Sequence, residues 1–350
     1  MDGSAAAERI ARICDSVGDA RSLRLQLIAQ IRRVIDFDAY VWLLTDPETS
    51  VGSVPLADVP CLPELARLIR LKYLTDVNRW TTLGPRAVGS LYAATGGDLR
   101  RSRLWRELLA GYGIGDMASS AFKDRYGFWG FLDLWRYDTA PQFSEADLTF
   151  LSTIIEPVTT AMRRCQANTF VHPISAHPRR PGPVVLLFSP DLDVLGQTPE
   201  THKYLRVLVP PSADRRPIPA SAYNVAAQLL ALEADVDQNP PLARVHLADG
   251  LWLALSAARM GDSGPLASRN IAVTIEEASP SERVSIFARA FALSPRESQL
   301  LRNLVTGSDT RQLAAQMFLS EHTVQDHLKA IFVKTATHSR RTLLSRCLGT

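Results

Sequence analysis

Apolar side chains recur at helical spacing near the start of the chain. Leu23, Leu27 and Ile31 lie four residues apart, so one face of a helix would carry all three. The aromatic and branched run at 37–45 has the composition of a strand. The beginning of the chain is therefore predicted to be helical and to lead into a sheet.

A hairpin and a long helix are predicted next. The segments 115–123 and 127–136 are rich in strand-forming residues and are separated by a short polar turn, which indicates two antiparallel strands. Ser144, with Asp147 three residues later, is the pattern of a capped helix start. We expect this helix to be kinked at Pro157, because proline lacks an amide proton.

The middle of the chain again mixes strands with helix. Apolar runs predict strands at 184–188, 243–247, 251–257 and 271–275, and a helix at about 219–232. Clustered proline and glycine indicate one break in the chain, and Ser279-Pro280 indicates a second. The predicted boundaries are a domain at 1–165, a linker at 166–182, a domain at 183–278, a linker at 279–290 and a domain at 291–350.

Helix start and stop signals are dense after residue 291. Ser294, Pro295 and Glu297 supply a capping hydroxyl, a proline at the first helical position and a capping carboxylate, and Gly307 is suited to end that helix. Ser320 is a further capping residue after a short turn. This spacing predicts four helices, which begin near residues 295, 310, 321 and 339.

Two short helices around a three-to-four-residue turn are the helix-turn-helix arrangement, whose second helix enters the DNA major groove. On the helix predicted after Ser320, Val324, Leu328 and Ile331 share one face, which would be buried. Residues 291–350 hold eight basic and four acidic side chains, whereas the whole chain has a net charge of only +3. Positive potential is thus concentrated where phosphates would lie.

This segment resembles the LuxR/FixJ-type DNA-binding domain. The resemblance rests on LSPRE at 293–297, Leu300, Leu301, Gly307, Leu313, Ala314, SEHTV at 320–324, His327, Ile331, Lys334, Ser339 and Arg340. It implies a four-helix domain that binds double-stranded DNA and usually dimerises through its last helix.

The resemblance also assigns the expected DNA contacts. The base-reading positions are Gln325, Asp326 and Lys329, the backbone-contacting positions are Thr323, His327 and Lys334, and His322 and Arg340 complete the expected surface. Asp326 is a departure, because a carboxylate repels phosphate although it can accept a hydrogen bond from cytosine N4. His327 has a second interpretation, as a half-buried packed side chain.

The elements upstream resemble two sensor domains in their order alone. Helices, strand pairs, a hairpin and a long closing helix resemble a GAF-like domain over 1–165, and two strands, helices and three strands resemble a PAS-like domain over 183–278. The predicted fold class is α+β: a GAF-like sensor and a PAS-like sensor, followed by an all-α four-helix helix-turn-helix domain.

Two sets of apolar side chains have competing interpretations. Five aromatic residues could line a ligand pocket in the first domain, although core packing explains any one of them better: Trp42, Trp80, Phe122, Trp129 and Trp135. On the last helix Leu343, Leu344 and Cys347 form an apolar stripe. We expect this stripe to meet a second subunit, and the alternative is that it closes the core of its own domain.

Signatures of enzymes, metal sites and membrane proteins are missing from the sequence. No lysine follows a glycine, as a phosphate-binding loop requires, and neither G-x-S-x-G nor H-E-x-x-H occurs. The four cysteines lack metal-ligand spacing, and the N-terminus lacks the pattern of a signal peptide. We therefore expect no catalytic activity, no cofactor, no metal site, no membrane partner and a cytoplasmic location.

These observations favour a one-component transcription regulator. Its sensor domains, with room for an unidentified small-molecule effector, would modulate a homodimer that binds DNA. A response regulator is disfavoured, because residues 1–35 have the pattern of helix and not of a strand that ends in paired acids. The alternative is a signalling adaptor whose sensor domains bind protein partners and whose C-terminal helices only dimerise; salt-dependent DNA affinity would discriminate between the two.

Overall fold

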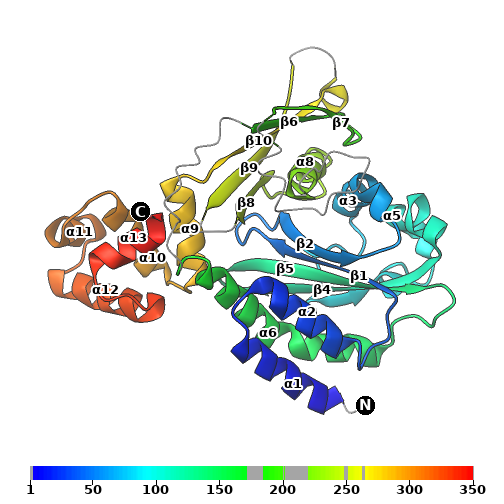
Figure 1. The fold of residues 1–350 in the computed structure, drawn as a ribbon, viewed down its shortest axis with the longest axis horizontal. Helices are drawn as coiled ribbons and strands as arrows, with labels where there is room; N and C mark the ends of the chain where they lie inside the picture. The colour runs from blue at the N-terminus through cyan, green and yellow to red at the C-terminus, as the bar shows by residue number, and fades with distance from the viewer. Residues whose placement is uncertain are drawn as a thin grey trace.

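In this computed structural model the described part of the chain has two five-stranded antiparallel sheets with helices packed on them, followed by a C-terminal group of helices (Figure 1). The structure describes residues 3–171, 184–199, 201, 220–247, 251–261 and 265–349. The C-terminal helices form a lobe to one side of both sheets (Figure 1). The expected combination of a mixed helix-and-sheet part with a helical C-terminal domain is confirmed.

The first sheet has the strand order β2-β1-β5-β4-β3. Its strands are β1 (Ala39–Thr45), β2 (Gly52–Asp58), β3 (Val88–Ser90), β4 (Ile114–Asp124) and β5 (Gly127–Tyr137). The predicted hairpin is β4 and β5, which close at Asp124 and Gly127. The strand β2, which the sequence analysis missed, lies at the edge of the sheet, where Pro55 opposite Leu43 is tolerated.

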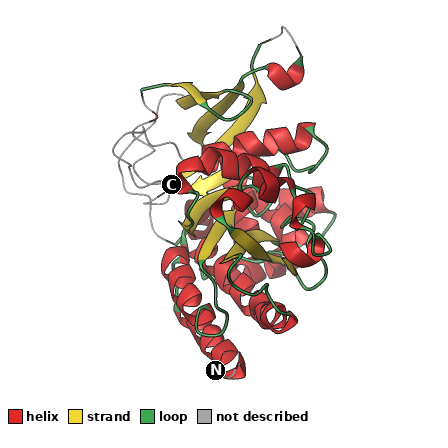
Figure 2. Ribbon diagram, turned by 90° about the vertical axis from the view of Figure 1, so that its right-hand side faces the viewer, coloured by secondary structure: helices red, strands yellow, loops and turns green. Residues whose placement is uncertain are grey.

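Helices cover both faces of the first sheet (Figures 1 and 2). On one face lie α2 (Ala20–Ile31) and α6 (Glu145–Asn168), and α1 (Gly3–Ser16) packs against these two helices. Towards the other face lie α3 (Leu65–Tyr73), α4 (Leu91–Ala94), α5 (Arg103–Glu107) and the single turns Leu62–Glu64, Leu99–Arg101 and Leu109–Tyr112. Neighbouring strand residues such as Trp42 and Leu43 belong to different cores because side chains alternate across a strand.

The closing helix α6 begins at the predicted capping box of Ser144 and Asp147 and contains Pro157. It continues to Asn168, so the first residues of the linker predicted at 166–182 are helical. Residues 172–182 of that linker lie outside the described part of the chain.

The second sheet repeats the order of the first, as β7-β6-β10-β9-β8. Its strands are β6 (Val184–Phe188), β7 (Val194–Gln197), β8 (Leu242–His246), β9 (Trp252–Arg259) and β10 (Ile271–Glu277), with a single turn at Leu266–Ser268. Helix α8 (Ala220–Glu233) lies between the two sheets (Figure 1) and contacts both. Eleven of its 14 residues are buried, as expected for a helix that is covered on both sides.

A helix corrects the linker predicted at 279–290. Helix α9 (Pro280–Ala290) begins at a capping box of Ser279 and Glu282. Ser279-Pro280 therefore starts a helix, because proline is favoured at the first helical position. The first sheet and its helices (residues 3–171) form a first unit, and the second sheet with α8 (within residues 184–278) forms a second unit. Phe287 on α9 contacts Phe170, at the end of the first unit, and Phe170 stacks on Trp252 of β9 in the second; the ring centroids are 5.3 and 5.2 Å apart. This helix joins all three parts of the chain.

Four further helices follow α9, as predicted. They are α10 (Pro295–Val305), α11 (Thr310–Met317), α12 (Glu321–Thr335) and α13 (Arg340–Leu348). Ser294, Ser320 and Ser339 cap the helices that follow them, and Gly307 after α10 has a left-handed φ of +90°. Among the residues that the structure describes, no helix is long and apolar enough to cross a membrane.

Candidate nucleic-acid interface and effector cavity

The turn between α11 and α12 presents α12 at the surface. Phe318 ends α11 in the left-handed conformation, with φ 55° and ψ 47°, which reverses the chain. The Ser320 hydroxyl accepts the Thr323 amide at 3.1 Å and starts α12. The predicted inner face of α12 is buried: the exposed fractions of Val324, Leu328 and Ile331 are 0%, 1% and 0%.

The outer face of α12 carries the polar side chains expected there. The side chains of His322, Asp326 and Lys329 are 85%, 54% and 72% exposed, and Gln325 is exposed beside them. The Asp326 carboxylate lies 3.3 Å from the Lys329 ammonium, so it partly neutralises this face. Val333 lies one turn beyond Lys329, is 82% exposed and extends the same face. It was not predicted as part of this surface, although its position four residues after Lys329 indicates the same side of the helix.

Two of the expected DNA contacts are engaged inside the domain. Lys334 lies 2.6 Å from the carboxylate of buried Glu297, and Arg340 donates to the Thr310 hydroxyl at 2.6 Å. Burial alone would raise the pKa of Glu297, but the Lys334 ammonium and the capping hydrogen bonds of Ser294 lower it below its usual value. These side chains hold α12 and α13 to the helices before them.

Thr323 and His327 are half-buried, between the exposed residues of α12 and the two side chains engaged inside the domain. The Thr323 hydroxyl is 2.8 Å from that of Ser320, at the start of α12. His327 is half-buried, which is compatible with both interpretations given to it.

The predicted dimerisation stripe on α13 needs a correction. Leu343 and Cys347 are both 0% exposed, because α9 packs on α13 and closes the core over them. The Arg283 guanidinium donates to the Cys347 carbonyl at 3.2 Å, and burial raises the pKa of the Cys347 thiol to about 12. Within one chain the stripe therefore fills the core of its own domain, and of its three residues only Leu344 is half-buried.

Comparison with known proteins identifies this helical domain. Residues 292–346 match the family described as bacterial regulatory proteins, luxR family. They form a LuxR-family helix-turn-helix domain. The resemblance inferred from the sequence is thereby confirmed, and DNA binding is favoured over an adaptor role.

The curated relatives match over the same part of the chain. A nitrate/nitrite response regulator protein homolog of Haemophilus influenzae is 43% identical over 49 residues, which is 14% of this chain and 24% of that protein. A probable HTH-type transcriptional regulator, GfsR of Streptomyces halstedii, is 38% identical over 60 residues, 17% of this chain and 25% of that protein. The chain spans about a quarter of the length of these curated relatives.

Among solved structures, Escherichia coli SdiA aligns over 100% of this chain and 98% of its own, with 12% sequence identity and a TM-score of 0.37.

All five candidate pocket aromatics belong to the hydrophobic cores. Trp42 stacks on Phe122 with ring centroids 5.3 Å apart, Trp80 stacks on Phe131 at 4.6 Å, and the Trp129 indole donates to Asp124 at 3.1 Å. All of them are nearly inaccessible to solvent, as large aromatic side chains of a core are. Trp135 also lines a cavity.

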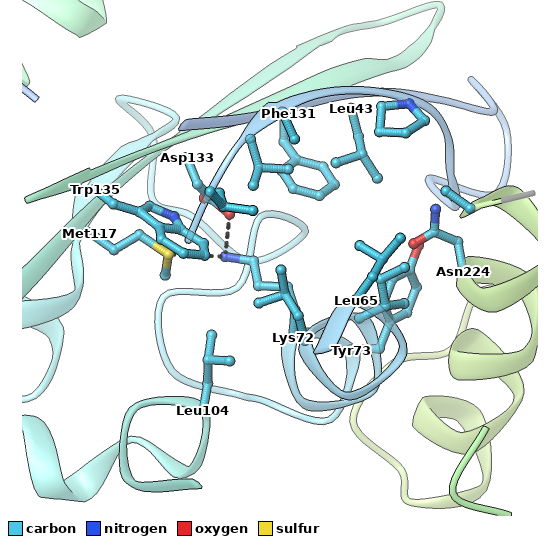
Figure 3. Close-up of a pocket in the computed structure, with 17 residues that line it drawn as sticks. Leu43, Leu65, Lys72, Tyr73, Leu104, Met117, Phe131, Asp133, Trp135 and Asn224 are labelled. Atoms are coloured by element: carbon cyan, nitrogen blue, oxygen red, sulfur yellow. Dashed lines mark hydrogen bonds and ion pairs between the residues drawn. The ribbon is translucent and has the colours of Figure 1, made fainter. Parts of the chain in front are cut away.

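That cavity lies between the first sheet and α3 and has a volume of about 50 Å³ (Figure 3). The first sheet forms one wall, α3 another, and Ala220 and Asn224 of α8 close it. Most of its lining is aliphatic, and its charged side chains are Lys72 and Asp133, paired at 2.9 Å. Neither residue was predicted from the sequence, because the two partners are far apart in the chain.

Proposed function

We propose that this chain is a one-component transcription regulator whose α12 reads the DNA major groove and whose two sheet-containing units act as GAF-like and PAS-like sensors. The observation that carries the proposal is the division of α12, within a LuxR-family domain, into a buried apolar face and an exposed face with Gln325 and Lys329. Such a face can donate to and accept from base edges.

Contacts through α9 support control of DNA binding by the sensors. Glu48, in the first unit, accepts a hydrogen bond from Ser285 of α9 at 2.8 Å and one from Arg244 of the second unit at 2.9 Å. Arg289 of α9 donates to the Tyr126 carbonyl at 2.8 Å. A rearrangement of either sheet would therefore shift α9, and with it the position of α10 and α13, which pack on it.

Selection of bound sequences from random DNA by the purified full chain tests the proposal. We expect enrichment of one motif and an affinity that falls steeply with salt, because lysine and arginine displace counterions from phosphates. An adaptor would enrich no sequence. DNA affinity that is insensitive to salt would contradict the proposal in the same experiment.

Two lysines of α12 provide a matched test of base reading, with Lys329 as the test residue and Lys334 as the control. Lys329→Ala is expected to weaken binding to the selected site by about 1–3 kcal/mol and to relax the preference at one base pair. Lys334→Ala should chiefly lower the stability of the domain, since it leaves buried Glu297 unpaired. Equal loss on all sequences for Lys329→Ala would instead indicate a phosphate contact.

A two-fold dimer is part of the proposal, because one helix reads too few base pairs to find a site in a genome. Half-sites about 10 base pairs apart are then expected. Leu344 is the stripe residue placed to meet a second copy, so Leu344→Asp should impair dimerisation on DNA. Analytical ultracentrifugation on the selected site checks this, and one chain per intact site would exclude the dimer.

A further inference from the structure

The cavity of the first unit is completed by a side chain of the second. Asn224 is the fifth residue of α8 and lines the cavity together with Tyr73 of α3 (Figure 3). The first sheet lies over both, and its aliphatic side chains make up most of the remaining wall. A molecule in this cavity would thus contact both sheet-containing units.

Asn224 carries unused hydrogen-bonding groups. It is 1% exposed, and both its amide nitrogen and its amide oxygen have no hydrogen-bond partner among the residues that the structure describes. Buried amides are normally paired, because an unpaired one costs the free energy of removing it from water. The indole nitrogen of Trp135, towards the other end of the cavity, is likewise unpaired in the described structure (Figure 3).

The charged groups of the cavity are already satisfied. The Asp133 carboxylate pairs with the Lys72 ammonium at 2.9 Å and accepts from the Ser119 hydroxyl at 2.6 Å. The Lys72 and Asp133 side chains are only 8% and 3% exposed. The lining therefore has no net charge, and a charged ligand would lose its hydration without gaining a counterion.

We infer that this cavity binds a small, uncharged, mostly apolar molecule whose amide, carbonyl or hydroxyl group pairs with the Asn224 side chain. The inference rests on the proposed function, in which such a molecule would be the effector. A cavity of about 50 Å³ has room for several non-hydrogen atoms, since about 10–15 Å³ suffices for one water. Ligand contact through α8 would make the second unit part of the binding site.

Three four-carbon probes that differ in charge test the ligand class: butanamide, butyrate and butylammonium. Each is titrated into the isotope-labelled full chain, and the side-chain amide signal of Asn224 and the indole signal of Trp135 are followed by NMR. We expect butanamide to shift both signals and the two ions to shift neither. Equal shifts by an ion, or none by butanamide, would overturn the inference.

Substitution of Asn224 tests its role. Asn224→Leu should weaken butanamide binding about tenfold, the contribution of one buried hydrogen bond, while Asn168→Leu, whose amide donates to Gly18 far from the cavity, should not. Because the amide is unpaired without ligand, Asn224→Leu should unfold at the same temperature as the parent chain or a higher one. If the Asn224→Leu variant does not fold, Asn224→Ala is used for the same binding measurement. Undiminished binding by a folded variant would refute the assignment.

DNA binding is measured on the same preparations without a probe. Intact DNA binding with no response to butanamide would remove the cavity assignment and leave the proposed function standing. If the parent chain itself does not bind DNA, the proposed function is contradicted, and the probe titrations can still be interpreted.

Discussion

The two sheets have the same strand order but are covered differently. The first sheet is covered on one face by its own α2 and α6, backed by α1, and on the other by α3, α4 and α5. The second packs on α8, and the far side of that helix packs on β2 and α3 of the first unit. The first unit thus closes most of its own core, whereas the second shares its helix with a neighbour.

Polar contacts reinforce this dependence. Asp46, fully buried in the first unit, accepts from the backbone and guanidinium of Arg244 on β8 at 2.7–2.8 Å. Burial works against the charge of Arg244, but the hydrogen bonds and charge of Asp46 raise the pKa of that guanidinium above its usual value. Arg79 of the first unit pairs with Asp237 of the second in the same way, at 2.8 Å. The second sheet is held as a dependent part of one structure.

Separation of the units should have the largest effect. A fragment of residues 3–171 is expected to unfold cooperatively, because its sheet keeps helices on both faces. A fragment of residues 184–278 is expected not to fold, because α8 would expose one of its buried sides to water. Circular dichroism during urea titration checks both, with residues 1–278 as the reference. A cooperative transition in the 184–278 fragment would mean that the second unit is independent.

Removal of Asp46 should have the next largest effect. Asp46→Ala leaves the buried Arg244 without its main partner and should lower the free energy of unfolding by about 3–5 kcal/mol. The control is Arg86→Ala, which breaks an exposed pair with Glu145 and should cost less than about 1 kcal/mol. Replacement of both Asp46 and Arg244 by apolar residues should recover much of the lost free energy of unfolding. If it does not, the pair contributes net stability and does more than neutralise two buried charges.

The sequence predicted elements far better than it predicted their contacts. The capping residues of α10 and α12 and the apolar face of α12 are local signals, so the helix-turn-helix could be predicted from them. The Asp46 and Arg244 pair joins residues 198 positions apart, which no local pattern indicates. The stripe on α13 was assigned to a second subunit because α9, which buries it, was interpreted as a linker. Likewise α8 was expected, but its polar Asn224 gave no sign of facing another unit's cavity.

Asp237 should give a smaller, pH-dependent effect. Burial alone would raise the pKa of Asp237, but the Asn239 amide and the Arg79 guanidinium lower it below its ordinary value. The pair therefore stabilises the fold fully above the ordinary carboxylate pKa, and this contribution is lost as the pH falls through the lowered value. Asp237→Asn should cost about 1.5–3 kcal/mol at pH 7, and urea titrations at decreasing pH should show the difference shrinking. A constant difference at every pH would exclude the charge as its cause.

The contact between α9 and the first unit should give the smallest effect. Ser285 donates to Glu48 at 2.8 Å near the surface, so Ser285→Ala should lower the free energy of unfolding by about 0.5–1.5 kcal/mol. Ser281→Ala is the control on the same helix, since its hydroxyl contacts only Ser279 among the residues described. Because Glu48 also binds Arg244, this contact connects α9 to both sheets at one carboxylate. Hydrogen exchange of the α9 amides is the sharper measurement. Faster exchange in α9, with β1 and β8 unchanged, is expected if the helix is held by this contact. Unchanged exchange in α9 would show that the Arg289 hydrogen bond to Tyr126 and the aromatic cluster around Phe287 hold the helix without it.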